Sequence, residues 1–231
     1  MAESRERVMY VNGRIIPHIQ AMEELQRDDM RSAGGFYDHE RTFNRKVFRL
    51  REHLERLYRG LAFSRIDPGM SLEEMETIAL DNLEADLPLL PDGDEFEVTQ
   101  VVSLSPTQSP EEKPRVNVVM YCEPLDFASF AISYVKGVRV VTPSTYAVPT
   151  QSPSSVARYD QQRVLPLMTG RDGSITECKG GNFMFVRDGR IKLPDRRNVL
   201  PGVSMHTVLE LADSLKVPVD EGDYSIYDVY K

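Results

Sequence analysis

The stretch from Gly173 to Ser204 constrains the fold of this chain more than any other part of it. Residues 173–189 read Gly-Ser-Ile-Thr-Glu-Cys-Lys-Gly-Gly-Asn-Phe-Met-Phe-Val-Arg-Asp-Gly, and residues 200–204 read Leu-Pro-Gly-Val-Ser. β-Branched and aromatic residues bounded by glycine turns predict a β-hairpin, which carries the carboxylate of Glu177. The Gly-Val-Ser turn predicts the start of a helix with Ser204 as its N-cap. The stretch therefore predicts a carboxylate followed by a helix N-terminus whose amides suit an anion.

The composition is that of a soluble globular protein. With 231 residues the chain can form one large or two modest domains, and its 41% hydrophobic and 28% charged residues are ordinary. The net charge of −8 argues against a nucleic-acid surface. Cys122 and Cys178 have no paired spacing, which favours a reducing compartment. Because the sequence has no apolar signal core and no membrane-spanning run, we expect a cytoplasmic protein without membrane contact.

Turn residues and apolar spacing predict an α/β region at the N-terminus. Asn12-Gly13 favours the tight turn of a hairpin, and Ser71 with Glu74 reads as a capping box. The predicted elements are a hairpin over 8–16, two short strands within 38–50, helices over 50–62 and 71–83, and strands over 96–104 and 116–121. We place the N-terminal domain at residues 1–123.

Residues 124–231 are predicted to form a strand-rich second domain. A strand is expected over 133–142 and a loop over 143–160, where proline, serine and threonine are frequent. Strands over 164–168, 175–177, 183–187 and 190–193 are expected to form a meander, followed by a helix over 204–215 and a strand from 217. The fold class is therefore α/β with mixed sheets (α+β in character) in two lobes.

These motifs together resemble the class IV aminotransferases, the fold-type-IV pyridoxal-phosphate enzymes. That family includes branched-chain and D-amino-acid aminotransferases and aminodeoxychorismate lyase. The pattern Thr-Glu, Asn-Phe and Asp-Gly over residues 176–189 matches the segment of the family that holds its cofactor. The resemblance runs from Tyr10 to Tyr230. It implies pyridoxal 5′-phosphate as cofactor, no metal, and a homodimer in which a neighbouring subunit completes the site.

The resemblance assigns the cofactor contacts to three segments. It implies that Glu177 keeps the pyridine nitrogen protonated, and that Val203 and Ser204 contact the phosphate. The motif His53-x-x-Arg56-Leu implies that the Arg56 guanidinium reaches the same phosphate. We expect these residues to meet at one pocket. From the residues alone, Glu177 could equally be an exposed hairpin glutamate, and Arg56 could belong to a solvated charged helix face.

The segment Gly34-Gly-Phe-Tyr-Asp resembles the loop and strand that lie over the substrate in the family. It implies that Tyr37 and Arg41 face the substrate. An alternative is that Tyr37 simply packs in the sheet. The predicted strand over 96–104 contains no arginine, although many relatives carry one on the matching strand to bind the substrate carboxylate.

The lysine to which such enzymes attach the cofactor is not identified by the resemblance. Residues 149–163 stand where the family carries it, and they contain no lysine. Lys136, expected early in an edge strand, and Lys179, in the hairpin of Glu177, are the fallback candidates, although both also read as surface lysines. The end of the chain resembles a strand that precedes a further family segment, so we expect a C-terminal end that is incomplete.

The function implied by the resemblance is a pyridoxal-phosphate-dependent aminotransferase. Its substrates would be a branched-chain-like amino acid and a 2-oxo acid. One alternative is a non-catalytic relative that keeps the fold as a binding or dimerisation module. A second alternative is a lyase on the same scaffold, which differs in the fate of the substrate after activation.

Overall fold

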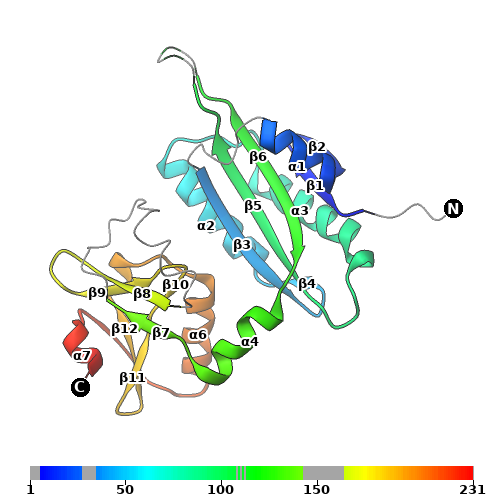
Figure 1. The fold of residues 1–231 in the computed structure, drawn as a ribbon. Helices are drawn as coiled ribbons and strands as arrows, with labels where there is room; N and C mark the ends of the chain where they lie inside the picture. The colour runs from blue at the N-terminus through cyan, green and yellow to red at the C-terminus, as the bar shows by residue number, and fades with distance from the viewer. Residues whose placement is uncertain are drawn as a thin grey trace. The chain divides into compact units, whose positions relative to one another are not determined.

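The computed structural model describes residues 6–27, 35–107, 109, 111, 113–142 and 164–230. The chain divides into two compact units, Met1–Asp126 and Phe127–Lys231 (Figure 1). The sequence analysis places the domain boundary after residue 123. The predicted loop over 143–160 and the lysine-free segment 149–163 lie in the gap between residues 142 and 164, outside the described residues.

The first unit is built on a six-stranded antiparallel sheet with the order β2-β1-β6-β5-β3-β4. The strands are β1 (Val8–Val11), β2 (Arg14–Pro17), β3 (Gly35–Phe43), β4 (Lys46–Val47), β5 (Phe96–Leu104) and β6 (Val116–Pro124). The predicted β1–β2 hairpin is confirmed. Its turn has φ of 47° at Asn12 and 94° at Gly13, the left-handed pair that a two-residue turn requires.

Two predicted helices cover one face of this sheet. Helix α2 (Leu50–Phe63) buries Leu54, Leu57 and Leu61, and α3 (Leu72–Asp86) buries Met75 and Ala79 against the same core. The predicted capping box at the start of α3 is confirmed, because the Ser71 hydroxyl accepts from the Glu74 amide and the Glu74 carboxylate accepts from the Ser71 amide. A 3-10 turn, η1 (Leu87–Leu89), follows α3.

Helix α1 (His18–Arg27) was not predicted. It buries Ala21 and Leu25 in a second cluster with Met9, Val11 and Val119. Met9 and Val119 alternate with Tyr10 and Met120, which belong to the core under α2 and α3. Because successive strand residues point to opposite faces, α1 packs on the other face of the sheet.

Within residues 127–142 and 164–230, the described part of the second unit, the strands form two small sheets. One has the order β10-β9-β8-β7, with β7 (Arg139–Val141), β8 (Val164–Thr169), β9 (Ile175–Cys178) and β10 (Gly181–Asn182). The other has the order β11-β12-β13, with β11 (Phe185–Arg187), β12 (Arg190–Pro194) and β13 (Val219–Gly222). The helical elements are α4 (Phe127–Lys136), η2 (Arg196–Asn198), α6 (Val203–Ser214) and α7 (Ile226–Tyr230). Leu167, Ile175 and Cys178 form a buried hydrophobic cluster.

The predicted meander is wrong, because its strands divide between two sheets. Strand β8 pairs antiparallel with β9, and β11 pairs antiparallel with β12, but β9 and β11 belong to different sheets. Parallel pairs join β7 to β8 and β12 to β13. Helix α6 supplies the crossover between β12 and β13. Two parallel pairs together with antiparallel hairpins give the mixed sheets that were predicted.

Two predicted strands are helical for part of their length. The strand expected over 133–142 is wrong in its first half, because α4 continues to Lys136 and ends at Gly137, which has φ of 71°. At the C-terminus, the run resembling a strand folds into α7, where the Ser225 amide and hydroxyl both donate to the Asp228 carboxylate. This local cap favours a helix start over extended chain.

Across the described ranges, no helix combines the length and apolar character needed to cross a bilayer.

Candidate functional site

Glu177 lies on β9 and binds the turn that leads into α6. Its Oε2 accepts a hydrogen bond of 2.8 Å from the Leu200 amide and lies 3.4 Å from Nδ2 of Asn182. Burial raises the pKa of the Glu177 carboxyl, while the bond from the Leu200 amide acts to lower it. A cationic group next to the half-buried Glu177 would stabilise the ionised carboxylate and would therefore lower the pKa of Glu177.

Helix α6 begins one residue earlier than predicted. Its N-cap is Gly202, with no side-chain hydrogen bond, and Val203 is its first residue, so the prediction of Ser204 as N-cap is wrong. The reason lies in the preceding turn, where the Gly202 amide donates to the Leu200 carbonyl and the His206 amide already donates to the Gly202 carbonyl. The first turn contains no acidic residue. Val203 is buried and Ser204 is exposed, and amides in a first helix turn lack intrahelical acceptors, so this turn is suited to an anion.

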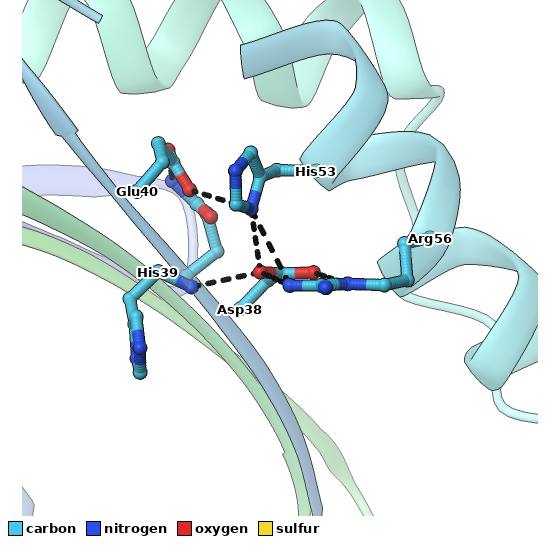
Figure 2. A network of polar contacts seen from close by, with 6 residues as sticks. Asp38, His39, Glu40, His53 and Arg56 are labelled. Atoms are coloured by element: carbon cyan, nitrogen blue, oxygen red, sulfur yellow. Dashed lines mark hydrogen bonds and ion pairs between the residues drawn. The ribbon is translucent and has the colours of Figure 1, made fainter. Parts of the chain in front are cut away.

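Arg56 on α2 is held by a buried carboxylate (Figure 2). Its Nε donates to Oδ2 of Asp38 at 2.8 Å, and its Nη2 donates to Oδ1 at 2.5 Å. Nδ1 of His53 lies 2.9 Å from the same Oδ1. Because an ionised carboxylate only accepts, that nitrogen carries the proton. Burial raises the pKa of Asp38, but the bonds from His53 and Arg56 outweigh it and leave the pKa below its ordinary value.

A second carboxyl lies beside this pair. Glu40 accepts a 2.8 Å hydrogen bond from Nε2 of Gln100 at its Oε1, whereas its buried Oε2 has no hydrogen-bond partner and lies 3.9 Å from Nδ1 of His53. Burial raises the pKa of Glu40 to about 8, opposed by the bond from Gln100 and reinforced by the charge of Asp38. Glu40 is therefore mainly protonated at neutral pH, beside the ion pair of Asp38 and Arg56.

The same cluster brings together groups that bind metals. Ligand atoms of Asp38, Glu40 and His53 lie within 4.8 Å of one another. However, the Arg56 guanidinium already supplies a positive charge at Asp38. A metal ion bound to the same carboxylate would be repelled by that guanidinium. The arrangement therefore fits an ion pair that orients Arg56 rather than a metal centre.

The raised pKa of Glu40 predicts how the stability of the first unit depends on pH. Between the ordinary value of 4.5 and about 8, the unfolded chain loses this proton while the folded chain keeps it. The free energy of unfolding contributed by Glu40 therefore falls as the pH rises through that window. Glu40→Gln cannot titrate, so we expect its melting temperature to fall less than that of the parent from about pH 5 to about pH 8.

Thermal denaturation followed by circular dichroism at several pH values measures this difference. Glu84→Gln, an exposed position on α3, is the matched control and should keep the pH dependence of the parent. Parallel curves for Glu40→Gln and the parent would contradict a protonated Glu40.

Sequence reasoning missed Asp38, Glu40 and His53 as a group. The signal was present, because Asp38 and Glu40 are two residues apart on a strand and therefore share a face. His53 and Arg56 are three residues apart on a helix and are neighbours on its surface. Only the packing of α2 on β3 shows that these two faces meet.

The predicted substrate residues lie on the opposite face of β3. Tyr37 is 66% exposed and stacks on His39, with ring centroids 5.8 Å apart. The Arg41 guanidinium lies 4.0 Å from the centre of the Phe43 ring. Tyr37 also lines a cavity of about 330 Å³, whose other walls include Met9, Met22, Val101 and Tyr121. The side chain of Tyr37 is therefore accessible and borders a hollow whose walls are mostly apolar side chains but also include His18, Ser103 and Glu123.

The two fallback lysines are both exposed. Lys136 is the last residue of α4, so its expected place in an edge strand is wrong. Lys179 lies in the turn between β9 and β10, where its amide donates to the Pro166 carbonyl. Lys179 thus follows the strand of Glu177 rather than continuing it.

Comparison with known proteins gives a consistent result. Residues 35–231 match the family model described as amino-transferase class IV. A probable branched-chain-amino-acid aminotransferase of Rickettsia bellii is 26% identical over 234 residues, covering 92% of this chain and 76% of that protein.

Solved structures of similar fold include the branched-chain amino acid aminotransferase of Escherichia coli, with a TM-score of 0.81 and 19% identity over 97% of this chain and 80% of that one. The branched-chain amino acid aminotransferase of Thermobaculum terrenum in its PLP form gives a TM-score of 0.77 and 16% identity over 99% of this chain and 80% of that one. The predicted fold type is thus confirmed.

Proposed function

Because the chain belongs to amino-transferase class IV, we propose that it transfers an amino group between a branched-chain-like amino acid and a 2-oxo acid. Its cofactor is pyridoxal 5′-phosphate, the cofactor of the family and the one named for the Thermobaculum terrenum structure. The observation that carries the proposal is the 2.8 Å bond between Glu177 and the Leu200 amide, since it fixes a carboxylate next to the turn that opens α6.

The residues of the second unit fit two ends of this cofactor. Glu177 is a half-buried carboxylate with a raised pKa, which suits the protonated pyridine nitrogen. The first turn of α6 offers the amides of Val203 and Ser204 to the phosphate, without an acidic residue to repel it. When bound, the cofactor withdraws electrons from the substrate carbon that bears the amino group.

We propose Arg56 as a further phosphate ligand. Its bonds to Asp38 use Nε and Nη2, so Nη1 is left out of that pairing. Asp38 and His53 fix the plane of the guanidinium, which lowers the entropy lost when it donates to an anion. The neutral state of Glu40 supports this role, because a second negative charge there would weaken anion binding.

Tyr37 and Arg41 are proposed to face the substrate. Tyr37 is accessible and borders the apolar cavity with Met9, Met22 and Val101, which suits an aliphatic side chain. Strand β5 has no arginine, so recognition of the substrate carboxylate differs from that of relatives that carry one there.

A coupled assay tests the proposed reaction. The purified chain with added pyridoxal 5′-phosphate is incubated with L-isoleucine or D-alanine and a 2-oxo acid, and formation of the new amino acid is measured. Where turnover is found, it should be greater with L-isoleucine than with D-alanine. Binding of the cofactor without turnover of either amino acid would favour the alternative of a non-catalytic binding module.

The lysine-free segment 149–163 leads to a specific expectation. After incubation with pyridoxal 5′-phosphate, borohydride reduction and peptide mapping, we expect no lysine to be labelled stoichiometrically. Lys136 is the last residue of a helix and Lys179 lies in a turn, and both side chains are exposed rather than enclosed in a pocket. A single specific adduct at Lys136 or Lys179 would contradict this expectation and identify a relocated lysine.

We also propose a homodimer, as the family resemblance implies, and a cytoplasmic location, which the net charge of −8 and the two cysteines without paired spacing favour. Sedimentation equilibrium of the purified chain measures its mass in solution, and a monomer at all concentrations would contradict the dimer.

A further inference from the structure

Asn182 lies at the junction between the strand of Glu177 and the turn that opens α6. Its Nδ2 donates a 2.8 Å hydrogen bond to the Leu200 carbonyl and lies 3.4 Å from Oε2 of Glu177. The Leu200 amide donates to the same Oε2 at 2.8 Å. Asn182 and Glu177 therefore bind both backbone groups of Leu200, one side chain to each.

The hairpin fixes where Asn182 stands. Asn182 on β10 is directly opposite Glu177 on β9 in their antiparallel pair. Residues opposite each other across two strands have side chains on the same face, so the amide is held beside the carboxylate. The position of Leu200 relative to this hairpin then depends on side-chain bonds across a sequence separation of 18 and 23 residues.

Gly202 shows how closely Asn182 approaches the start of α6. A Cβ atom at residue 202 would lie 2.1 Å from Oδ1 of Asn182, far inside van der Waals contact. The backbone of Gly202 has φ of −68°, which any residue adopts, so space rather than conformation requires glycine here. The Asn182 side chain thus occupies the volume next to the N-cap of α6.

We infer that Asn182 is a positioning residue, which sets the first turn of α6 at a fixed place relative to the Glu177 carboxylate. This inference rests on the proposed function, in which those two features hold opposite ends of one rigid cofactor. A ligand that spans both ends needs their spacing, whereas inorganic phosphate needs only the groups that bind the phosphate end. Asn182 should therefore matter more for pyridoxal 5′-phosphate than for inorganic phosphate.

The test compares Asn182→Ala with the parent and with Asn198→Ala, an exposed asparagine in the connection before α6. Binding of pyridoxal 5′-phosphate is followed by its absorbance, and binding of inorganic phosphate by competition. Asn182→Ala should weaken pyridoxal 5′-phosphate about three- to tenfold, the loss of roughly one hydrogen bond, and inorganic phosphate by less than about twofold. Asn198→Ala should leave both affinities unchanged.

Hydrogen exchange of the peptide covering residues 199–206, measured without ligand, reports the turn itself. We expect faster exchange in Asn182→Ala. If exchange is faster but both ligands weaken equally or neither weakens, Asn182 has only a structural role and the inference is overturned. Exchange and affinity that match the parent overturn it as well. If the parent chain does not bind pyridoxal 5′-phosphate at all, the proposed function fails and this role fails with it.

The close approach of Asn182 to Gly202 allows a second test of the inference. Gly202→Ala should weaken pyridoxal 5′-phosphate in the parent, because the new methyl group displaces the Asn182 side chain. In the Asn182→Ala background the clash with the Asn182 amide is gone and the methyl group keeps an ordinary contact with Cβ of Met205 at 3.6 Å, so the two losses should not add. Additive losses would show that the two positions act independently. They would contradict the inference that the hydrogen bond from Asn182 to Leu200 places the first turn of α6.

Discussion

Replacing Asp38 with alanine is expected to lower the free energy of unfolding of the first unit by about 3–5 kcal/mol. Asp38 is 3% exposed and accepts two hydrogen bonds from Arg56 and one from His53. Its removal leaves the Arg56 guanidinium, whose side chain is 18% exposed, without its counter-charge between α2 and the sheet. The cost is that of an uncompensated, partly buried charge, which exceeds the value of the ion pair itself.

Urea denaturation followed by circular dichroism measures this loss. Asp92→Ala is the matched control, because Asp92 is fully exposed and lies 3.7 Å from Arg45, a surface ion pair of small value. The control should stay within about 0.5 kcal/mol of the parent. A similarly small change for Asp38→Ala would refute the view that this carboxylate holds Arg56 in place.

Glu177→Gln is expected to reduce turnover by about tenfold or more while the fold stays intact. The glutamine oxygen can still accept the Leu200 amide, so the turn before α6 keeps its anchor. A neutral amide cannot stabilise the protonated pyridine nitrogen, and a hydrogen bond to a charged group is worth about 1.5–3 kcal/mol. Each 1.4 kcal/mol in the barrier is about a factor of ten in rate.

Initial rates for parent and variant, with melting temperatures measured alongside, test this expectation. Asp188→Asn serves as the control, since it removes an exposed carboxylate from the turn between β11 and β12 of the same unit. Equal rates for Glu177→Gln and the parent would remove Glu177 from the cofactor site. A reduced rate accompanied by a lower melting temperature would indicate misfolding instead. Asp188→Asn shows how much the rate and the melting temperature change when a surface carboxylate of this unit is removed.

The elements that were predicted correctly are determined by residues that lie close together in the sequence. Asn12-Gly13 closes a hairpin because both residues accept left-handed backbone, and the Ser71–Glu74 box starts α3 through bonds made within four residues. The leucines of α2 are buried as their spacing predicts. The match of residues 35–231 to the class IV family likewise agrees with short motifs read directly from the chain.

The features that could not be predicted from the sequence depend on packing between segments that are distant along the chain. Residues 133–136 have strand-like composition but fold as the end of α4, where Gly137 stops the helix. Ser204 has the chemistry of an N-cap, yet Gly202, two residues earlier, takes that position because Asn182 and Leu200 close the turn there. Local preference amounts to fractions of a kcal/mol per residue, so tertiary contacts override it.

The sequence by itself determined the family, the hairpin of Glu177 and the helix that follows it, because each is written in residues close together along the chain. Only the tertiary structure decided the environment of the charged groups. Asp38 and Arg56 are 18 residues apart, and Glu40 and Gln100 are 60 apart, so their pairing depends on which faces α2 and β5 present to β3. Burial and partner distance set their charge states, and neither quantity exists until the chain is folded.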